Sequence, residues 1–78
     1  MLFKKSRMEK YSNKRGNSPI THFQIEDRSI VVRFTEGKSY SYSYLKAGQH
    51  HIERMKTLAK AGSGLCAYIT QNVKYKYD

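Results

Sequence analysis

The side chains that most often perform catalysis or hold metal ions are few in this sequence, and their spacing does not form a set. Cys66 is the only cysteine, and a cysteine nucleophile needs a histidine partner and a lowered pKa. His50 and His51 are neighbours, and neighbouring helical positions project about 100° apart, so these two cannot jointly hold one metal ion. The acids are scattered over turns, one helix and the last position, so no pair indicates general acid–base catalysis. We therefore expect a protein that is not an enzyme, with no metal site and no cofactor.

A run of alternating tyrosines and serines is the most distinctive stretch of the sequence. Tyr40, Tyr42 and Tyr44 alternate with the serines at positions 39, 41 and 43. Alternation with a period of two places the three rings on one face of a strand. Rings that face a helical layer belong to the core, whereas rings that face solvent form a platform on which unpaired bases stack. We expect the core arrangement, with the ring edge of Tyr44 exposed at the end of the strand.

The basic composition indicates polyanions as partners. The sequence has 15 Lys and Arg against 6 Asp and Glu, a formal net charge of +9 and a pI of about 9.9. A positive field of this kind attracts nucleic acid first, with anionic membranes and acidic proteins as further alternatives. A basic protein that is merely soluble is the remaining alternative, because charge alone does not identify a partner.

The beginning of the chain is the most basic part of it. Residues 1–17 contain six of the basic residues and a single acid, Glu9. Few apolar side chains accompany them, and the Gly-Asn-Ser-Pro sequence at residues 16–19 is typical of a break between segments. These features predict a flexible basic arm over residues 1–17 and a folded domain over residues 18–78. The arm either orders on contact with a polyanion or is a solubilising tail; a short helix over Lys4–Lys14 is the alternative.

Three segments after the arm have the pattern of antiparallel strands. Ile20–Ile25 alternates between two faces, and Ser29–Thr35 is a β-branched run with one apolar face. The tyrosine run is the third segment. Turn residues separate the runs, and Gly37 can take the positive φ that a short hairpin loop needs. The sequence therefore predicts a sheet of two hairpins.

The hydrophobic period changes after the tyrosine run. Lys46–Ala61 places apolar residues such as Ile52 and Met55 at spacings of three and four, as in an amphipathic helix. Gly62 suits the left-handed cap that would end this helix. A second helix is predicted over Gly64–Asn72, with a strand as the alternative for this last segment. The predicted fold class is α+β: a three-stranded antiparallel sheet of two hairpins, followed by two short helices packed on one face.

A short Tyr-x-Tyr motif, Tyr40-Ser41-Tyr42, follows Gly37 and a Val-Arg-Phe sequence at residues 32–34. With these residues, positions 18–78 resemble the KTSC domain, a small module at the C-terminus of some lysyl-tRNA synthetases and a free-standing bacterial protein. Further matching positions are Ile20, Ile25, Ile52, Leu58, Ala61, Ser63, Val73 and Tyr77. The chain departs from the family at residues 46–48, where the proline that usually opens the family's helix is absent. The resemblance implies a compact module of β-hairpins and helix, without catalytic residues, and suspected of binding RNA.

Charge and resemblance together predict a small non-catalytic module that binds nucleic acid. RNA, associated with tRNA or rRNA, is the expected partner, and DNA is the alternative. The candidate contacts are basic side chains for phosphates and tyrosine rings for unpaired bases: Lys4, Lys5, Arg7, Lys10, Lys14, Arg15, Lys38, Lys74, Lys76, Tyr44, Tyr75 and Tyr77. The alternative function is a protein-interaction or homodimerisation module that uses an exposed sheet edge and has no nucleic-acid role.

The apolar segments of the sequence are short. No window approaches the roughly 18 apolar residues of a membrane-spanning helix, and Met1–Phe3 is too short for the hydrophobic region of a secretory signal. A single cysteine cannot form an intramolecular disulfide, which suits a reducing compartment. We therefore expect a cytoplasmic protein without a membrane partner.

Overall fold

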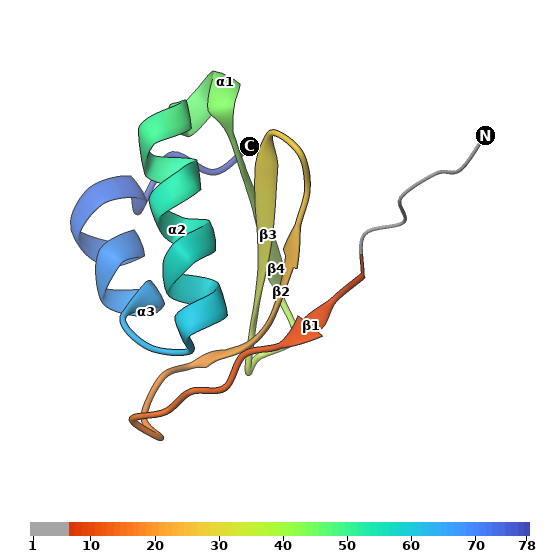
Figure 1. Cartoon of the computed structure of the whole chain (residues 1–78), viewed down its shortest axis with the longest axis vertical. Coiled ribbons are helices and arrows are strands. Elements are labelled where there is room, and N and C mark those ends of the chain that lie inside the picture. Colours follow the sequence, from red (N-terminus) through yellow and green to blue (C-terminus); the bar gives the residue numbers. More distant parts are fainter. Residues whose placement is uncertain (1–6) are drawn as a thin grey trace.

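A computed structural model shows four antiparallel strands and a helical layer that covers one face of the sheet (Figure 1). It describes residues 7–78. The strands, in the spatial order β1-β2-β3-β4, are Glu9–Lys10, Ile20–Ile25, Ser29–Phe34 and Ser39–Ser43. The helices are α1 (Tyr44–Ala47), α2 (Gln49–Ala61), α3 (Leu65–Tyr68) and the π-helical segment η1 (Ile69–Val73). The predicted α+β class, with short helices on an antiparallel sheet, is confirmed, but the predicted count of three strands was wrong.

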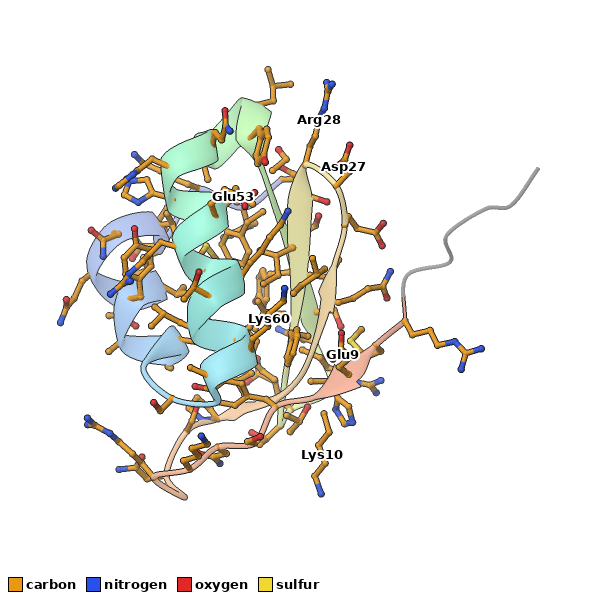
Figure 2. The ribbon with its side chains drawn as sticks, viewed as in Figure 1. Glu9, Lys10, Asp27, Arg28, Glu53 and Lys60 are labelled. Carbon is orange, nitrogen blue, oxygen red and sulfur yellow. The ribbon has the colours of Figure 1, made fainter. Side chains whose placement is uncertain are left out.

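Cross-strand pairing explains why the sheet has one apolar face. Phe23 lies opposite Val32, and Ile30 lies opposite Tyr42. Residues opposite each other in an antiparallel pair point to the same face, so these side chains form a continuous apolar surface under the helices. The β2–β3 turn carries Asp27 and Arg28, which Figure 2 shows at one end of the sheet.

The fourth strand comes from the segment that was predicted to be a flexible arm. Glu9 pairs with Phe23, at the edge of the sheet (Figure 2). The side chain of Tyr11 is only 3% exposed, and its hydroxyl accepts a hydrogen bond of 3.3 Å from the backbone N–H of Leu65. The prediction of a flexible arm over residues 1–17 is therefore wrong for residues 9–14, while residues 1–6 lie outside the described part of the chain.

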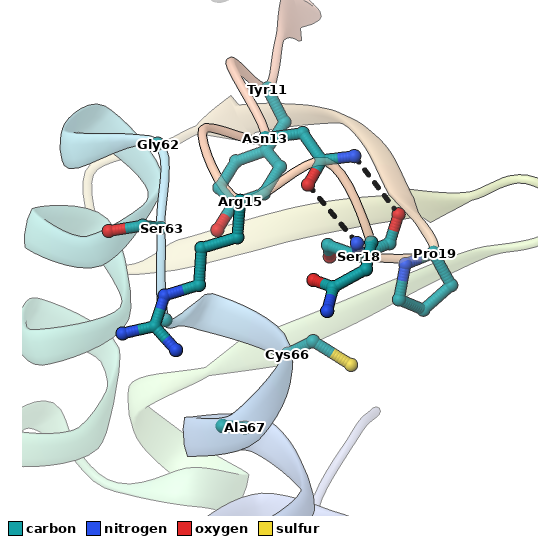
Figure 3. A pocket seen from close by; sticks show the side chains of 11 residues that line it. Tyr11, Asn13, Arg15, Ser18, Pro19, Gly62, Ser63, Cys66 and Ala67 are labelled. Carbon is teal, nitrogen blue, oxygen red and sulfur yellow. Dashed lines mark hydrogen bonds between the residues drawn. The ribbon is translucent and has the colours of Figure 1, made fainter.

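Further contacts hold this segment against the end of α2. The N–H of Lys14 donates to the carbonyl oxygen of Gly62 at 2.8 Å. The side chain of Asn13 exchanges two hydrogen bonds with the backbone of Ser18, which closes the loop that leads into β2 (Figure 3). One large buried ring and these hydrogen bonds offset the entropy lost on ordering. The folded unit therefore begins before residue 18, and Glu9–Lys10 is strand rather than part of a helix over Lys4–Lys14.

The tyrosine strand ends one residue earlier than its pattern suggests, because a helix cap interrupts it. The side chain of Ser43 accepts a hydrogen bond from the N–H of Lys46 and caps α1. Tyr44 is thus the first residue of α1. Gly48, at φ 98°, separates α1 from α2, so the predicted helix over Lys46–Ala61 is divided in two. Gly62, at φ 79°, ends α2 as expected.

The last helical segment agrees with the predicted helix over Gly64–Asn72 rather than with a strand. Leu65, Ile69 and Val73 recur at a spacing of four and are all buried, as one face of a helix requires. After Val73 the chain turns back toward the sheet, where the N–H of Asp78 donates to the carbonyl oxygen of Ser41 at 2.7 Å. No described helix is long and apolar enough to cross a membrane.

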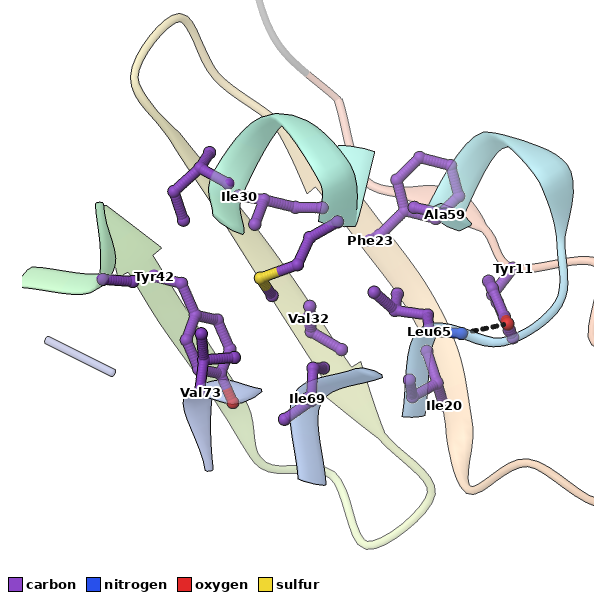
Figure 4. Packing of buried hydrophobic residues seen from close by; sticks show 13 residues of the cluster. Tyr11, Ile20, Phe23, Ile30, Val32, Tyr42, Ala59, Leu65, Ile69 and Val73 are labelled. Carbon is purple, nitrogen blue, oxygen red and sulfur yellow. Dashed lines mark hydrogen bonds between the residues drawn. The ribbon is translucent and has the colours of Figure 1, made fainter. Parts of the chain in front are cut away.

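The core lies between the sheet and the helical layer (Figure 4). Its buried residues are Tyr11, Ile20, Phe23, Ile30, Val32, Tyr42, Ala47, Ile52, Met55, Ala59, Leu65, Ile69 and Val73. Tyr42 is 2% exposed, and burial, with smaller contributions from Tyr40 and Tyr77, raises its pKa to about 12. Tyr40 and Tyr44 are half-buried and pack against this cluster. The core interpretation of the tyrosine run is therefore confirmed, and a platform of three solvent-facing rings on β4 is not formed.

Candidate nucleic-acid interface

The chain after η1 returns to β4 and closes a pocket of about 320 Å³, which we call the aromatic pocket. Most of its lining is aromatic or apolar, with one cation and one carboxylate. The lining residues are Phe34, Glu36, Tyr40, Tyr42, Cys66, Ile69, Thr70, Lys74, Tyr75 and Tyr77. Pockets of this size are at the lower end of the range for small ligands, about 300 to 1,000 Å³, so it suits a single planar ring system better than a large ligand.

The rings of the aromatic pocket hold one another in place. Tyr77 packs edge-on against Tyr40, with ring centroids 4.9 Å apart, and against Tyr42 at 6.4 Å. Phe34 meets Tyr40 at 5.8 Å with the rings nearly perpendicular. Edge-to-face contacts of this kind contribute about 0.5–1.5 kcal/mol each beyond burial. Tyr75 is 77% exposed, so its ring has a face free to stack on a ligand.

Asp78 fastens the last residues to β4. Its carboxylate accepts a hydrogen bond of 2.7 Å from the hydroxyl of Ser43 and a longer one from that of Ser41. Together with the backbone bond to Ser41, these contacts fix the position of Tyr77, the preceding residue. They also cover part of the outer edge of β4. The alternative of a partner strand pairing at a sheet edge stays a prediction.

Three of the residues predicted to contact nucleic acid line the aromatic pocket, and two more are exposed close to lining residues in the sequence. Lys74 lies with its Nζ 5.4 Å from the ring centroid of Tyr75, and Tyr75 and Tyr77 are lining residues. Lys76 is exposed between these two tyrosines. Lys38 is exposed in the β3–β4 turn that also carries the lining residue Glu36.

Tyr44 does not line the aromatic pocket. Its hydroxyl donates to Glu53 at 2.5 Å, and the ammonium of Lys56 lies 5.8 Å from its ring centroid. The hydrogen bond between Tyr44 and Glu53 raises the pKa of the tyrosine and lowers the pKa of the glutamate, with the hydrogen bond from Lys56 as a second cause of the lowered value. These contacts tie the ring of Tyr44 to α2, so it is a poor candidate for base stacking.

The described basic residues of the first segment do not line the aromatic pocket. Arg15 lines a second pocket of about 300 Å³, whose wall includes the turn Gly62–Gly64 (Figure 3). Cys66 lines both pockets. Lys14 is exposed beside this turn, to which its backbone is bonded. Arg7 and Lys10 are exposed at the β1 edge, and Lys4 and Lys5 lie outside the described residues.

Sequence reasoning missed five members of the aromatic pocket: Phe34, Glu36, Cys66, Ile69 and Thr70. The basic–aromatic alternation at residues 73–77 does not correspond to a strand, because the chain turns after Val73, where the N–H of Lys76 donates to the carbonyl oxygen of Val73 at 2.9 Å. Which strand that segment meets depends on contacts between residues far apart in the chain, and no local pattern encodes it.

The described histidines and acids do not assemble into a metal site. Across residues 7–78, no group of three or more His, Cys, Asp or Glu side chains could hold a metal ion. The Nδ1 of His51 shares a hydrogen bond of 2.7 Å with the hydroxyl of Tyr68, which joins α2 to α3, while His50 is exposed. His51 therefore has a structural contact in the helical layer.

Comparison with known proteins does not assign this chain to a family. No family model, no curated protein and no solved structure matches the chain. The resemblance of residues 18–78 to the KTSC domain therefore stays a prediction.

Proposed function

We propose that the protein binds single-stranded nucleic acid, RNA in the first place, by taking an unpaired base into the aromatic pocket. The main support for this proposal is that Tyr75, Tyr77 and Lys74 line the same pocket as the aromatic rings of β3 and β4. Stacking of a base on an aromatic side chain contributes about 1–3 kcal/mol. Stacking also requires that the base be unpaired, which favours single strands over a duplex.

The distribution of charge supports the same partner. Lys38 and Lys76 lie close along the chain to lining residues, and neither makes a described ion pair. Their ammonium groups would neutralise phosphates on either side of a bound base. The net charge of +9 adds a long-range attraction that does not depend on sequence.

RNA is the expected single strand for two reasons. The first is the KTSC resemblance of residues 18–78, since that module occurs with a tRNA-charging enzyme. The hydroxyls of Tyr75 and Tyr77 also offer hydrogen bonds to a ribose 2′-OH, the group that distinguishes RNA from DNA. tRNA and rRNA are accordingly the natural RNAs to test first.

The proposal is tested by fluorescence anisotropy with a short single-stranded RNA, the matching single-stranded DNA and a duplex DNA of equal length. Tyr75→Ala should weaken binding of the single-stranded RNA by about tenfold, because one stacking contact is lost. Since Tyr75 is largely exposed, the variant should keep the stability of the parent protein.

Leu45→Ala is the matched control, because Leu45 is 97% exposed and does not line the aromatic pocket. It should leave the affinity unchanged. Equal affinity of the Tyr75→Ala and parent proteins, or equal affinity for the single-stranded RNA and the duplex DNA, would contradict the proposal. The interaction-module alternative would then become the better hypothesis.

A further inference from the structure

The aromatic pocket contains one carboxylate, from Glu36, and one ammonium, from Lys74. An ionised carboxylate only accepts hydrogen bonds, and an ammonium only donates them. The pocket therefore presents an acceptor group and a donor group from two different elements, the β3–β4 turn and the segment after η1. Aromatic rings make up most of the remaining lining. A ligand that fills this pocket needs a planar ring system with donors on one edge and acceptors on another.

We propose that the aromatic pocket selects guanine among the four RNA bases, with Glu36 and Lys74 as the residues that determine the choice. This inference rests on the proposed binding of single-stranded nucleic acid. Guanine presents two adjacent donors, N1–H and N2–H₂, which match the two oxygens of a carboxylate. It also presents O6 and N7 as paired acceptors, the groups to which a lysine donates in base recognition.

The other bases complement this pair of groups less well. Adenine offers the carboxylate only its N6 amino group, and cytosine only its N4 amino group. Uracil has a single N–H donor, which lies between two carbonyl acceptors that would repel Glu36. When a base covers the pocket and excludes water, a carboxylate without a hydrogen-bond partner makes the free energy of binding much less favourable than a paired one does. The wrong base is therefore penalised as well as less strongly attracted.

Local structure fixes the backbone that carries Glu36, a lining residue of the pocket. Gly37 takes φ 92°, and its N–H donates to the carbonyl oxygen of Phe34 at 2.8 Å. The turn therefore closes directly beside a ring of the pocket wall. On the other side, Lys74 directly follows the buried residue Val73, which anchors the start of the segment.

The inference is tested with single-stranded oligouridine RNAs in which one central position is uracil, adenine, cytosine, guanine or inosine. The guanine RNA should bind about tenfold more tightly than the all-uridine RNA, the usual discrimination of one bidentate base contact. The inosine RNA, which lacks only the N2 amino group, should bind with intermediate affinity. Glu36→Gln should remove the preference for guanine, and it should raise the affinity for the all-uridine RNA, because the repulsion between the carboxylate and the uracil carbonyls is lost.

Asp27→Asn is the matched control, since it removes the same charge from the other hairpin turn, at the opposite end of β3. It should keep the preference for guanine. Equal binding of all five RNAs by the parent protein would overturn the inference and leave the proposed function standing. A guanine preference that survives in Glu36→Gln would overturn the role of Glu36. Failure of every RNA to bind would overturn the proposed function and this inference with it.

Discussion

Single tyrosines from the alternating stretches of the sequence have different roles in this protein. Tyr42 is buried in the core, Tyr44 is bonded to Glu53, and Tyr75 is open to solvent. The alternation of the tyrosine run correctly predicted that Tyr42 faces the helices, because a period of two fixes the face of a strand. It could not predict the contact of Tyr44, since the N-cap at Ser43 ends the strand there.

The buried hydroxyl of Tyr42 makes stability depend on alkaline pH. Its pKa is about 12 in the folded protein and 10.0 in its ordinary state, so the folded state holds this proton more tightly. The stability that results is fully present below about pH 10 and is lost as pH rises toward 12. Urea unfolding at several pH values should show this loss in the parent protein and a smaller loss in Tyr42→Phe. An identical pH dependence of the two proteins would contradict the burial of the hydroxyl.

Tyr11 provides a second test at the scale of one residue. Tyr11→Phe keeps the ring but leaves the N–H of Leu65 without its partner. A buried donor left unpaired costs about 1–3 kcal/mol, so the free energy of unfolding in urea should fall by that amount. Tyr75→Phe, at an exposed position, should have no such effect. A Tyr11→Phe protein as stable as its parent would contradict the hydrogen bond between the hydroxyl of Tyr11 and Leu65.

Strands and helices whose hydrophobic residues recur at a regular spacing were predictable from the sequence. Elements whose position depends on contacts between residues far apart in the chain were not. β2, β3 and α2 follow from alternation and from apolar residues at spacings of three and four. β1 has two residues, which is too short for any period, and its place is fixed by the ring of Tyr11. The same limit applies to the candidate site. Lys74, Tyr75 and Tyr77 were predictable from their residue types, but Glu36 and Thr70 became part of the site only when the last segment packed on β4.

A pair of glycines tests how the first segment packs on the end of α2. Gly62 and Gly37 both have positive φ, but a Cβ at Gly62 would lie 2.6 Å from the Cβ of Ser12, whereas one at Gly37 would meet nothing within 4 Å. Both Gly→Ala variants should lose about 1–2 kcal/mol to backbone strain. Gly62→Ala should lose about 1–3 kcal/mol more, from overpacking. Equal losses in thermal or urea unfolding would show that Ser12 does not pack on this turn.

At the scale of the whole molecule, the net charge and the pocket are expected to contribute differently to binding. The charge of +9 attracts any polyanion and is weakened by salt, whereas stacking in the aromatic pocket is specific to unpaired bases and nearly independent of salt. When log affinity for a single strand is plotted against log salt concentration, each phosphate that the protein neutralises contributes roughly −0.7 to the slope. Affinity measured over a range of salt concentrations therefore separates the two contributions.

Lys76→Ala should lower the salt slope of single-stranded RNA binding by about one unit at most, because a phosphate contact beside the pocket is lost. Lys46→Ala removes the same charge from α1, outside the pocket lining, and should leave the slope nearly unchanged. Tyr75→Ala should lower the affinity at every salt concentration without changing the slope. Equal slopes for Lys76→Ala and Lys46→Ala would contradict a phosphate contact at residue 76.

The measurement that tests the central claim most directly is an NMR titration of the protein with a short single-stranded RNA, followed at the tyrosine ring protons. If an unpaired base enters the aromatic pocket, the ring-proton signals of Tyr75 and Tyr77 should shift strongly. The reason is that these protons would then lie close to the aromatic ring of the base, whose ring current changes their chemical shifts. The ring of Tyr68, which is bonded to His51 in the helical layer, should shift little. Changes confined to lysine side chains, with the rings of Tyr75 and Tyr77 unmoved at saturation, would contradict the account and leave attraction by charge alone.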